Sequence, residues 1–210
     1  MKFLVLLTSV TGALAAAVAS PHQKRQTADD FDNGGCKGVV MVYARGSTEL
    51  GNIGTLGPNL RSTLNSRFPN NFAMQGVAYP ADLASNFLPD GSNAEAIATA
   101  KAKIEQVYNQ CPTARILAGG YSQGSAVISN AVEQLSDAVK ARLDGVVFFG
   151  YTKNLQNLGR IPGFPSNKLK VYCNVGDMVC SGTLIITAAH LTYGLKTTEA
   201  ALWLASKVQL

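Results

Sequence analysis

One short motif, Gly120-Tyr121-Ser122-Gln123-Gly124, restricts the folds open to this chain more than any other part of the sequence. An apolar run at residues 115–118 precedes it, and a segment with helical periodicity at residues 125–143 follows it. A G-x-S-x-G motif between a strand and a helix is typical of a sharp turn that exposes its serine at the top of a parallel sheet. The motif therefore predicts an α/β fold with Ser122 at a helix N-terminus, where the backbone favours developing negative charge.

Apolar runs typical of buried strands alternate along the rest of the chain with amphipathic stretches typical of helices. Such alternation predicts a parallel sheet with helices on both faces. We therefore expect a three-layer α/β sandwich with about five parallel strands in its central sheet. The predicted strands are residues 38–43, 115–118, 146–149 and 169–173, and the predicted helices are residues 58–68, 92–110, 125–143 and 198–207.

The first residues are typical of a secretory signal peptide, because Lys2 precedes an apolar run and then small residues at positions 15–20. Lys24-Arg25 adds a dibasic processing site. We expect a signal peptide at residues 1–20, a propeptide at residues 21–25 and one catalytic domain at residues 26–210. The apolar run is too short for a membrane anchor, so we expect a secreted protein without an integral membrane segment.

Removal of this leader would also remove most of the positive charge. The full sequence has 18 basic and 13 acidic residues, a net charge of +5. Without Lys2, Lys24 and Arg25, 15 basic residues face the same 13 acidic ones, and the net charge is +2. The sequence therefore does not predict nucleic-acid binding.

The four cysteines, Cys36, Cys111, Cys173 and Cys180, predict disulfides. An even number behind a signal peptide favours two disulfides over metal ligands, although three pairings are open. No Cys-x-x-Cys motif occurs and His190 is isolated in the sequence. We therefore expect no metal and no cofactor.

A serine nucleophile needs a base, and His190 is the one histidine outside the expected leader. In this kind of fold the orienting acid lies between the serine and the histidine in the chain. Asp177 follows a predicted strand and so lies at the carboxyl end of the sheet, where loops build the site. The other acids in that interval, on a helix face or before a strand, are Glu133, Asp137 and Asp144. We predict Ser122 as nucleophile, His190 as base and Asp177 as acid.

An oxyanion hole needs two donors, and the backbone N–H of Gln123, directly after the serine, is the first. The second is expected from a loop after an earlier strand, where Ser47 offers a backbone N–H and a hydroxyl. These residues predict a serine esterase that acts through an acyl-enzyme. Because its base must be neutral, activity should fall at low pH.

Several longer motifs resemble those of the fungal cutinases. They are A-R-G-S-T-E at residues 44–49, G-G-Y-S-Q-G at residues 119–124, G-Y-T-K-N-L-Q-N at residues 150–157, G-D at residues 176–177 and H-L-T-Y-G at residues 190–194. The resemblance runs from about Cys36 to the final helix and includes all four cysteines. It implies a small, lidless α/β-hydrolase fold with a central five-stranded parallel sheet. It also implies hydrolysis of cutin, the polyester of plant cuticle, and of short-chain soluble esters.

Position by position, the resemblance implies the same roles for Ser122, Asp177 and His190, and an oxyanion hole of Ser47 and Gln123. It implies that Asn86 orients Ser47. It implies the disulfides Cys36–Cys111 and Cys173–Cys180.

Two apolar loops, at residues 83–89 and 184–186, would flank the family's active site and suit an acyl chain and a waxy surface. Ser85 and Phe87 depart from the family pattern, so no chain-length preference is implied. The expected substrate-binding residues are Leu83, Phe87, Leu88, Tyr121, Leu184, Ile185 and Ile186.

Three other functions are alternatives to cutin hydrolysis for such a chain. An acetyl-xylan esterase would need a polar, sugar-binding cleft, whereas these loops are apolar. A lipase usually carries a lid helix, and no spare amphipathic helix is evident in the sequence. A secreted surface-binding protein without activity is the third alternative. We expect a monomer whose partner is an ester substrate: cutin, an aliphatic polyester or short-chain esters.

Overall fold

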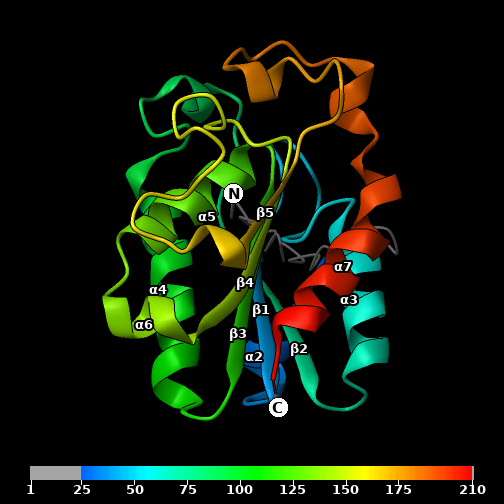
Figure 1. The fold of residues 1–210 in the computed structure, drawn as a ribbon, viewed down its shortest axis with the longest axis vertical. Helices are drawn as coiled ribbons and strands as arrows, with labels where there is room; N and C mark the ends of the chain where they lie inside the picture. Colours follow the sequence, from blue (N-terminus) through cyan, green and yellow to red (C-terminus); the bar gives the residue numbers. More distant parts are fainter. Residues whose placement is uncertain (1–24, 210) are drawn as a thin grey trace, which may run out of the picture.

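The computed structural model describes residues 25–209, so the expected signal peptide and residues 21–24 of the expected propeptide lie outside the described residues. Its centre is one parallel sheet with the strand order β2-β1-β3-β4-β5 (Figure 1). The predicted α/β sandwich with a five-stranded parallel sheet is confirmed. The strands are β1 (Val39–Ala44), β2 (Phe72–Gly76), β3 (Arg115–Tyr121), β4 (Leu143–Phe149) and β5 (Leu169–Tyr172).

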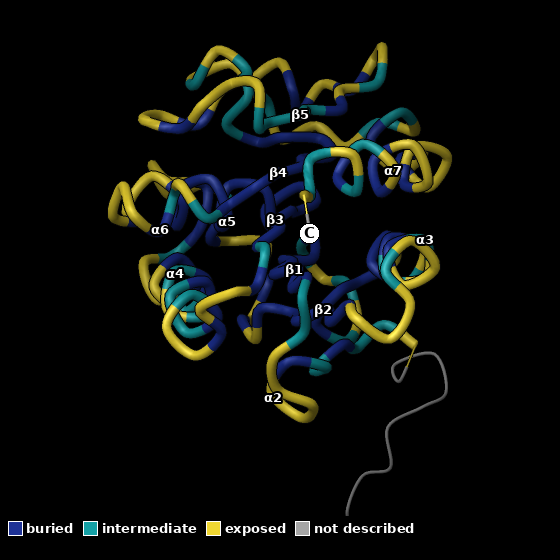
Figure 2. The backbone as a smooth tube through the Cα atoms, turned by 60° about the horizontal axis from the view of Figure 1, so that its bottom comes forward, coloured by how far each residue is buried: buried dark blue, intermediate teal, exposed yellow. Residues whose placement is uncertain are grey.

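Helices cover both faces of the sheet because successive side chains of each strand point to opposite sides. On β1, Val40 and Val42 pack into one core with α4 and α5, whereas Met41 and Tyr43 pack into the other core with α3 and α7. Figure 2 shows β1 to β4 mainly buried, β5 partly exposed and the helices exposed on their outer sides. The helices are α2 (Asp30–Gly34), α3 (Gly57–Arg67), α4 (Ala94–Gln110), α5 (Gln123–Glu133), α6 (Asp137–Arg142) and α7 (Thr197–Lys207).

Two elements differ from the sequence-based expectation. The helix expected at residues 125–143 is divided into α5 and α6, because Ser136 takes an extended conformation and its hydroxyl accepts the N–H of Val139. Such a cap starts a new helix rather than continuing the old one. Strand β2 was not among the predicted strands. It forms the edge of the sheet beside β1, next to α2.

The disulfides are Cys36–Cys111 and Cys173–Cys180, so the pairing implied by the family resemblance is confirmed. The first joins the segment before β1 to the residue that ends α4. The second closes the loop that follows β5. Among residues 25–209, no helix is both long and apolar enough to cross a membrane.

The loops at the carboxyl ends of the strands carry short 3-10 helices, which fix the side chains of the site described next. These are η1 (Ala84–Phe87), η3 (Val179–Ser181), η4 (Ala188–Leu191) and η5 (Tyr193–Lys196). A further one, η2 (Ser166–Lys168), leads into β5 at the opposite end of the sheet.

Candidate active site

The turn between β3 and α5 holds Ser122 in a backbone conformation that few residues adopt. Its φ is 52° and its ψ is −122°, and its N–H donates to the carbonyl of Phe149. A side chain at Gly120 would collide with the backbone of Gly124, and one at Gly124 would collide with the carbonyl of Ala44. The two glycines therefore allow strand and helix to approach closely enough to push Ser122 outward.

Ser122, His190 and Asp177 lie in one hydrogen-bonded line. The hydroxyl of Ser122 is 3.0 Å from Nε2 of His190, and Nδ1 of His190 is 2.9 Å from Oδ2 of Asp177. Ser122 is 9% exposed, His190 2% and Asp177 4%. An imidazole in this position can accept the hydroxyl proton while the carboxylate fixes its tautomer.

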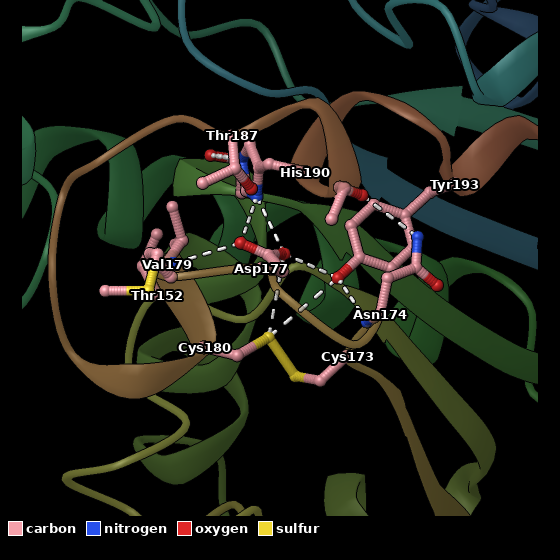
Figure 3. Close-up of polar contacts among 12 residues, drawn as sticks. Thr152, Cys173, Asn174, Asp177, Val179, Cys180, Thr187, His190 and Tyr193 are labelled. Carbon is pink, nitrogen blue, oxygen red and sulfur yellow. Dashed lines mark hydrogen bonds and ion pairs between the residues drawn. A yellow bond between two sulfur atoms is a disulfide. The ribbon is translucent and has the colours of Figure 1, made fainter.

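Asp177 lies in the loop after β5, which the Cys173–Cys180 disulfide brackets (Figure 3). Its Oδ1 accepts the N–H of Val179 at 3.0 Å, and its Oδ2 accepts the phenol of Tyr193 at 2.5 Å. Tyr193 was not among the predicted site residues. The signal was present, because this tyrosine belongs to the H-L-T-Y-G motif that begins with His190.

Tyr121 holds the other side of the imidazole. Its ring stacks on the His190 ring at 5.2 Å between centroids, and its phenol donates to the His190 carbonyl at 2.9 Å. Burial raises the pKa of Tyr121 above its ordinary value, so the phenol stays protonated and keeps this bond. The backbone and the ring of His190 are thus both fixed.

Ser47, Gln123 and Asn86 form a second hydrogen-bonded group beside Ser122. Asn86 Nδ2 donates to the Ser47 hydroxyl at 2.8 Å, and that hydroxyl donates to Gln123 Oε1 at 3.1 Å. Gln123 is also the first residue of α5, so its backbone N–H belongs to the group of helix N-terminal donors that lack an intrahelical acceptor. The group can present N–H and O–H donors to an oxygen bound at Ser122.

Helix η1 sets the position of Asn86, and Asp82 anchors that helix. The Asp82 carboxylate accepts the N–H of Ser85 at 2.8 Å and its hydroxyl at 2.7 Å. These bonds hold the pKa of Asp82 below its usual value, chiefly through the Ser85 hydroxyl. The Asp82 carbonyl accepts Gln123 Nε2 at 2.8 Å, which joins η1 to α5.

A cleft of about 330 Å³ opens over Ser122. Five of the seven predicted substrate-binding residues line it, whereas Leu88 and Ile185 are exposed and do not. Leu88 ends η1 in an extended conformation. The cleft is also lined by residues that were not among the predicted site residues. The lining residues are Ser47, Thr48, Leu83, Asn86, Phe87, Tyr121, Ser122, Thr152, Val179, Leu184, Ile186, His190 and Leu191.

Within residues 25–209, no group of three or more histidine, cysteine, aspartate or glutamate side chains is arranged to hold a metal ion.

The fold and these groups define a carboxylic ester hydrolase of the α/β-hydrolase type, and similarity to known proteins narrows the class. The Cutinase family model matches residues 35–208. The chain is 48% identical over 214 residues to the probable cutinase 5 of Aspergillus terreus, and the alignment covers 98% of this chain and 97% of that protein. The chain belongs to the cutinase family.

Solved structures agree with this assignment. A Trichoderma reesei cutinase in complex with a C11Y4 phosphonate inhibitor superposes with a TM-score of 0.77 at 31% identity, over 88% of this chain and 81% of that one. The catalytic core of a Trichoderma reesei acetyl xylan esterase has a TM-score of 0.68 at 20% identity, over 82% of this chain and 100% of that one. The second likeness shows the fold alone.

Proposed function

We propose that this protein hydrolyses cutin-type polyesters and short-chain soluble esters through an acyl-enzyme formed on Ser122. The observation that supports this best is the His190 imidazole, which lies within hydrogen-bonding distance of both the Ser122 hydroxyl and the Asp177 carboxylate. The apolar cleft above the hydroxyl supports an acyl or alkyl chain as its occupant.

The proposed reaction has two stages. In the first, Ser122 Oγ attacks the ester carbonyl while its proton passes to Nε2 of His190, and that proton then passes to the departing alcohol. In the second, water attacks the acyl-enzyme carbonyl while His190 takes one of its protons. The bond between the acyl carbon and Ser122 Oγ then breaks, His190 returns the proton to Oγ, and the acid leaves. Asp177 stabilises the imidazolium in both stages. Ser47 and the N–H of Gln123 hold the oxyanion, and Asn86 orients Ser47.

The rim of the cleft supports a polymer as substrate. Phe87 is 79% exposed, and Leu83 and Leu191 are 61% and 68% exposed. These side chains line the cleft from two segments, η1 with its preceding residue and η4, and their exposed parts can rest on an aliphatic surface and release water from it. An acetylated sugar would offer them no comparable apolar contact.

The test of this function compares p-nitrophenyl esters of increasing chain length, release of monomers from cutin and release of acetate from acetylated xylan. We expect hydrolysis of the esters and cutin, and little acetate from xylan. Phe87→Ala should lower cutin hydrolysis about tenfold and p-nitrophenyl acetate hydrolysis much less, because an acetyl ester uses little of the apolar contact area that this 79% exposed side chain offers to a polymer surface. Leu195→Ala, which removes an 88% exposed side chain outside the cleft, is the matched control. Preference for acetylated xylan would contradict the proposal.

Removal of one oxyanion donor gives a second prediction. Ser47→Ala should lower kcat about 100-fold with little change in KM, because the lost donor acts mainly on the charge that develops in the transition state. Asn86→Ala leaves the Ser47 hydroxyl in place and should lower kcat less. Initial-rate kinetics on p-nitrophenyl butyrate measures both. A raised KM with unchanged kcat in Ser47→Ala would assign Ser47 to substrate binding instead.

We also propose that residues 1–20 and 21–25 are removed and that the protein is secreted as a monomer. The two disulfides support an oxidising compartment. The Gln26 carbonyl, which accepts the N–H groups of Asn52 and Ile53 at 2.9 and 3.0 Å, supports a folded domain that begins at residue 26. N-terminal sequencing of the secreted protein tests the boundary, and gel filtration tests the monomer.

A further inference from the structure

We infer that Tyr193 is a positioning residue for the reaction, whose phenol fixes the orientation and the charge distribution of the Asp177 carboxylate that His190 faces. The inference rests on the proposed function of Ser122, His190 and Asp177. Tyr193 lines no part of the cleft. Its phenol reaches the reaction through Asp177, and its ring packs edge-on against the His190 ring, so only a variant that keeps the ring isolates the effect of the phenol.

The direction of the Tyr193 hydrogen bond follows from counting donors. Oη of Tyr193 lies 2.5 Å from Oδ2 of Asp177 and 3.0 Å from the backbone nitrogen of Asn174 (Figure 3). The nitrogen can only donate, so Oη accepts there. Its single hydrogen is therefore free to point at the carboxylate.

Asp177 has few other donors, which makes this bond important. Its side chain is fully buried, and apart from the imidazole the hydrogen donors described on it within residues 25–209 are the Val179 N–H and the Tyr193 phenol. Cys180 Sγ lies 3.8 Å from Oδ2, but a disulfide sulfur carries no hydrogen to donate. A buried carboxylate with too few donors is destabilised in its charged form. Burial, and then the bond to Asp177, raise the pKa of Tyr193 above its ordinary value, so the phenol remains a donor.

Tyr193 also joins the segment of the base to the loop of the acid. It begins η5, three residues after His190. Three further bonds join the same segments. The Thr187 hydroxyl donates to the Gly176 carbonyl at 2.9 Å, and Asn174 Nδ2 donates to the Ala189 carbonyl at 3.0 Å and to the Thr192 hydroxyl at 3.2 Å. None of these three ends on the Asp177 carboxylate, whereas the Tyr193 phenol does.

The titratable groups that face the Asp177–His190 pair are Tyr193 from η5 and Tyr121 from β3. Both phenols have a pKa raised chiefly by burial, so both stay protonated and neutral near neutral pH. The charge of Glu49 also raises the pKa of Tyr121. The Glu49 carboxylate accepts the backbone N–H groups of Gly46 and Thr55. The charge seen by His190 is thus set by Asp177 and by the donors on it.

Tyr193→Phe removes the phenol and keeps the ring, and we expect kcat to fall about tenfold with KM unchanged, the effect of one hydrogen bond to a charged group. The acid limb of the pH profile of kcat/KM should move to higher pH, because the carboxylate regains charge density and stabilises the imidazolium. Replacing Tyr193 by a ring-fluorinated tyrosine, a stronger donor of the same shape, should move the limb to lower pH.

Two controls separate this role from packing. Tyr172→Phe removes a phenol from the same core that bonds to Glu199 instead, and Thr187→Val removes a link between the same two segments without touching Asp177. Neither should move the acid limb. An unmoved limb in both Tyr193 variants, or an equal shift in Thr187→Val, would overturn the inference. Activity retained by Ser122→Ala would instead overturn the proposed function.

Discussion

Replacing Ser122 by alanine should lower kcat for p-nitrophenyl butyrate about a millionfold, since loss of the nucleophile in a serine hydrolase removes the whole acyl-enzyme route. The hydroxyl makes one side-chain hydrogen bond in the described structure, to His190, and the backbone turn does not depend on it. The variant should therefore fold normally, with an unchanged thermal midpoint.

An alkyl fluorophosphonate gives an independent measurement of the same residue. It should label the wild-type chain on the peptide that contains Ser122, and it should not label Ser122→Ala. Ser125→Ala is the control. The Ser125 hydroxyl lies three residues further along the chain and donates to the Ser122 carbonyl, so it is close to the nucleophile but has a different partner. Turnover by Ser122→Ala near the wild-type rate, or labelling of another serine, would refute the proposed nucleophile.

The turn at Ser122 could be predicted from sequence because its causes are local. Gly120 and Gly124 are required by backbone contacts within the turn and with the end of β1, and strand and helix patterns flank them on either side. Asp177 was also within reach, because a strand pattern before it places it at the carboxyl end of the sheet. Such inferences need the order of elements along the chain but not their packing.

Strand β2 was harder to predict because a polar residue lies inside it. Gln75 is 2% exposed, and its side chain donates to the carboxylate of Asp29 and accepts the N–H of Asp32. These partners come from the segment around α2, more than 40 residues earlier in the chain. A buried glutamine satisfied over that distance has no signal in the strand's own sequence.

Side-chain directions at the rim of the cleft were also hard to predict from the sequence. Ile185 and Ile186 are adjacent and are the same residue type, yet Ile186 lines the cleft and Ile185 does not. Tyr193 lies between the exposed Leu191 and Leu195 and is itself fully buried. Ile185 and Ile186 lie between η3 and η4, and Tyr193 begins η5. In such short irregular segments hydrophobic periodicity carries no information about side-chain direction. The reaction class was therefore predictable, whereas the chain-length preference was not.

Asp177→Asn should lower kcat about 10,000-fold, because the change imposes the wrong imidazole tautomer. Oδ1 of Asp177 accepts from the Val179 N–H and Oδ2 accepts from the Tyr193 phenol. Nδ1 of His190 lies 3.0 Å from Oδ1 and 2.9 Å from Oδ2. An asparagine that keeps its carbonyl toward Val179 places its NH₂ group at the position of Oδ2, where it can donate to Nδ1. With Nδ1 as acceptor, Nε2 carries the proton and cannot take one from Ser122.

Asp144→Asn is the matched control for this change. Asp144 is equally buried, and its carboxylate pairs with Arg115 near the amino ends of β3 and β4, far along the sheet from Ser122. It should lower the free energy of unfolding, because it breaks an ion pair with one buried partner, and it should leave kcat of the folded enzyme unchanged. Kinetics and thermal denaturation on both variants separate the two effects. If Asp177→Asn kept more than about a tenth of the activity, or if Asp144→Asn lost as much kcat, the acid of this site would have to be sought elsewhere, because the tautomer argument predicts a loss far larger than this for the true partner of His190.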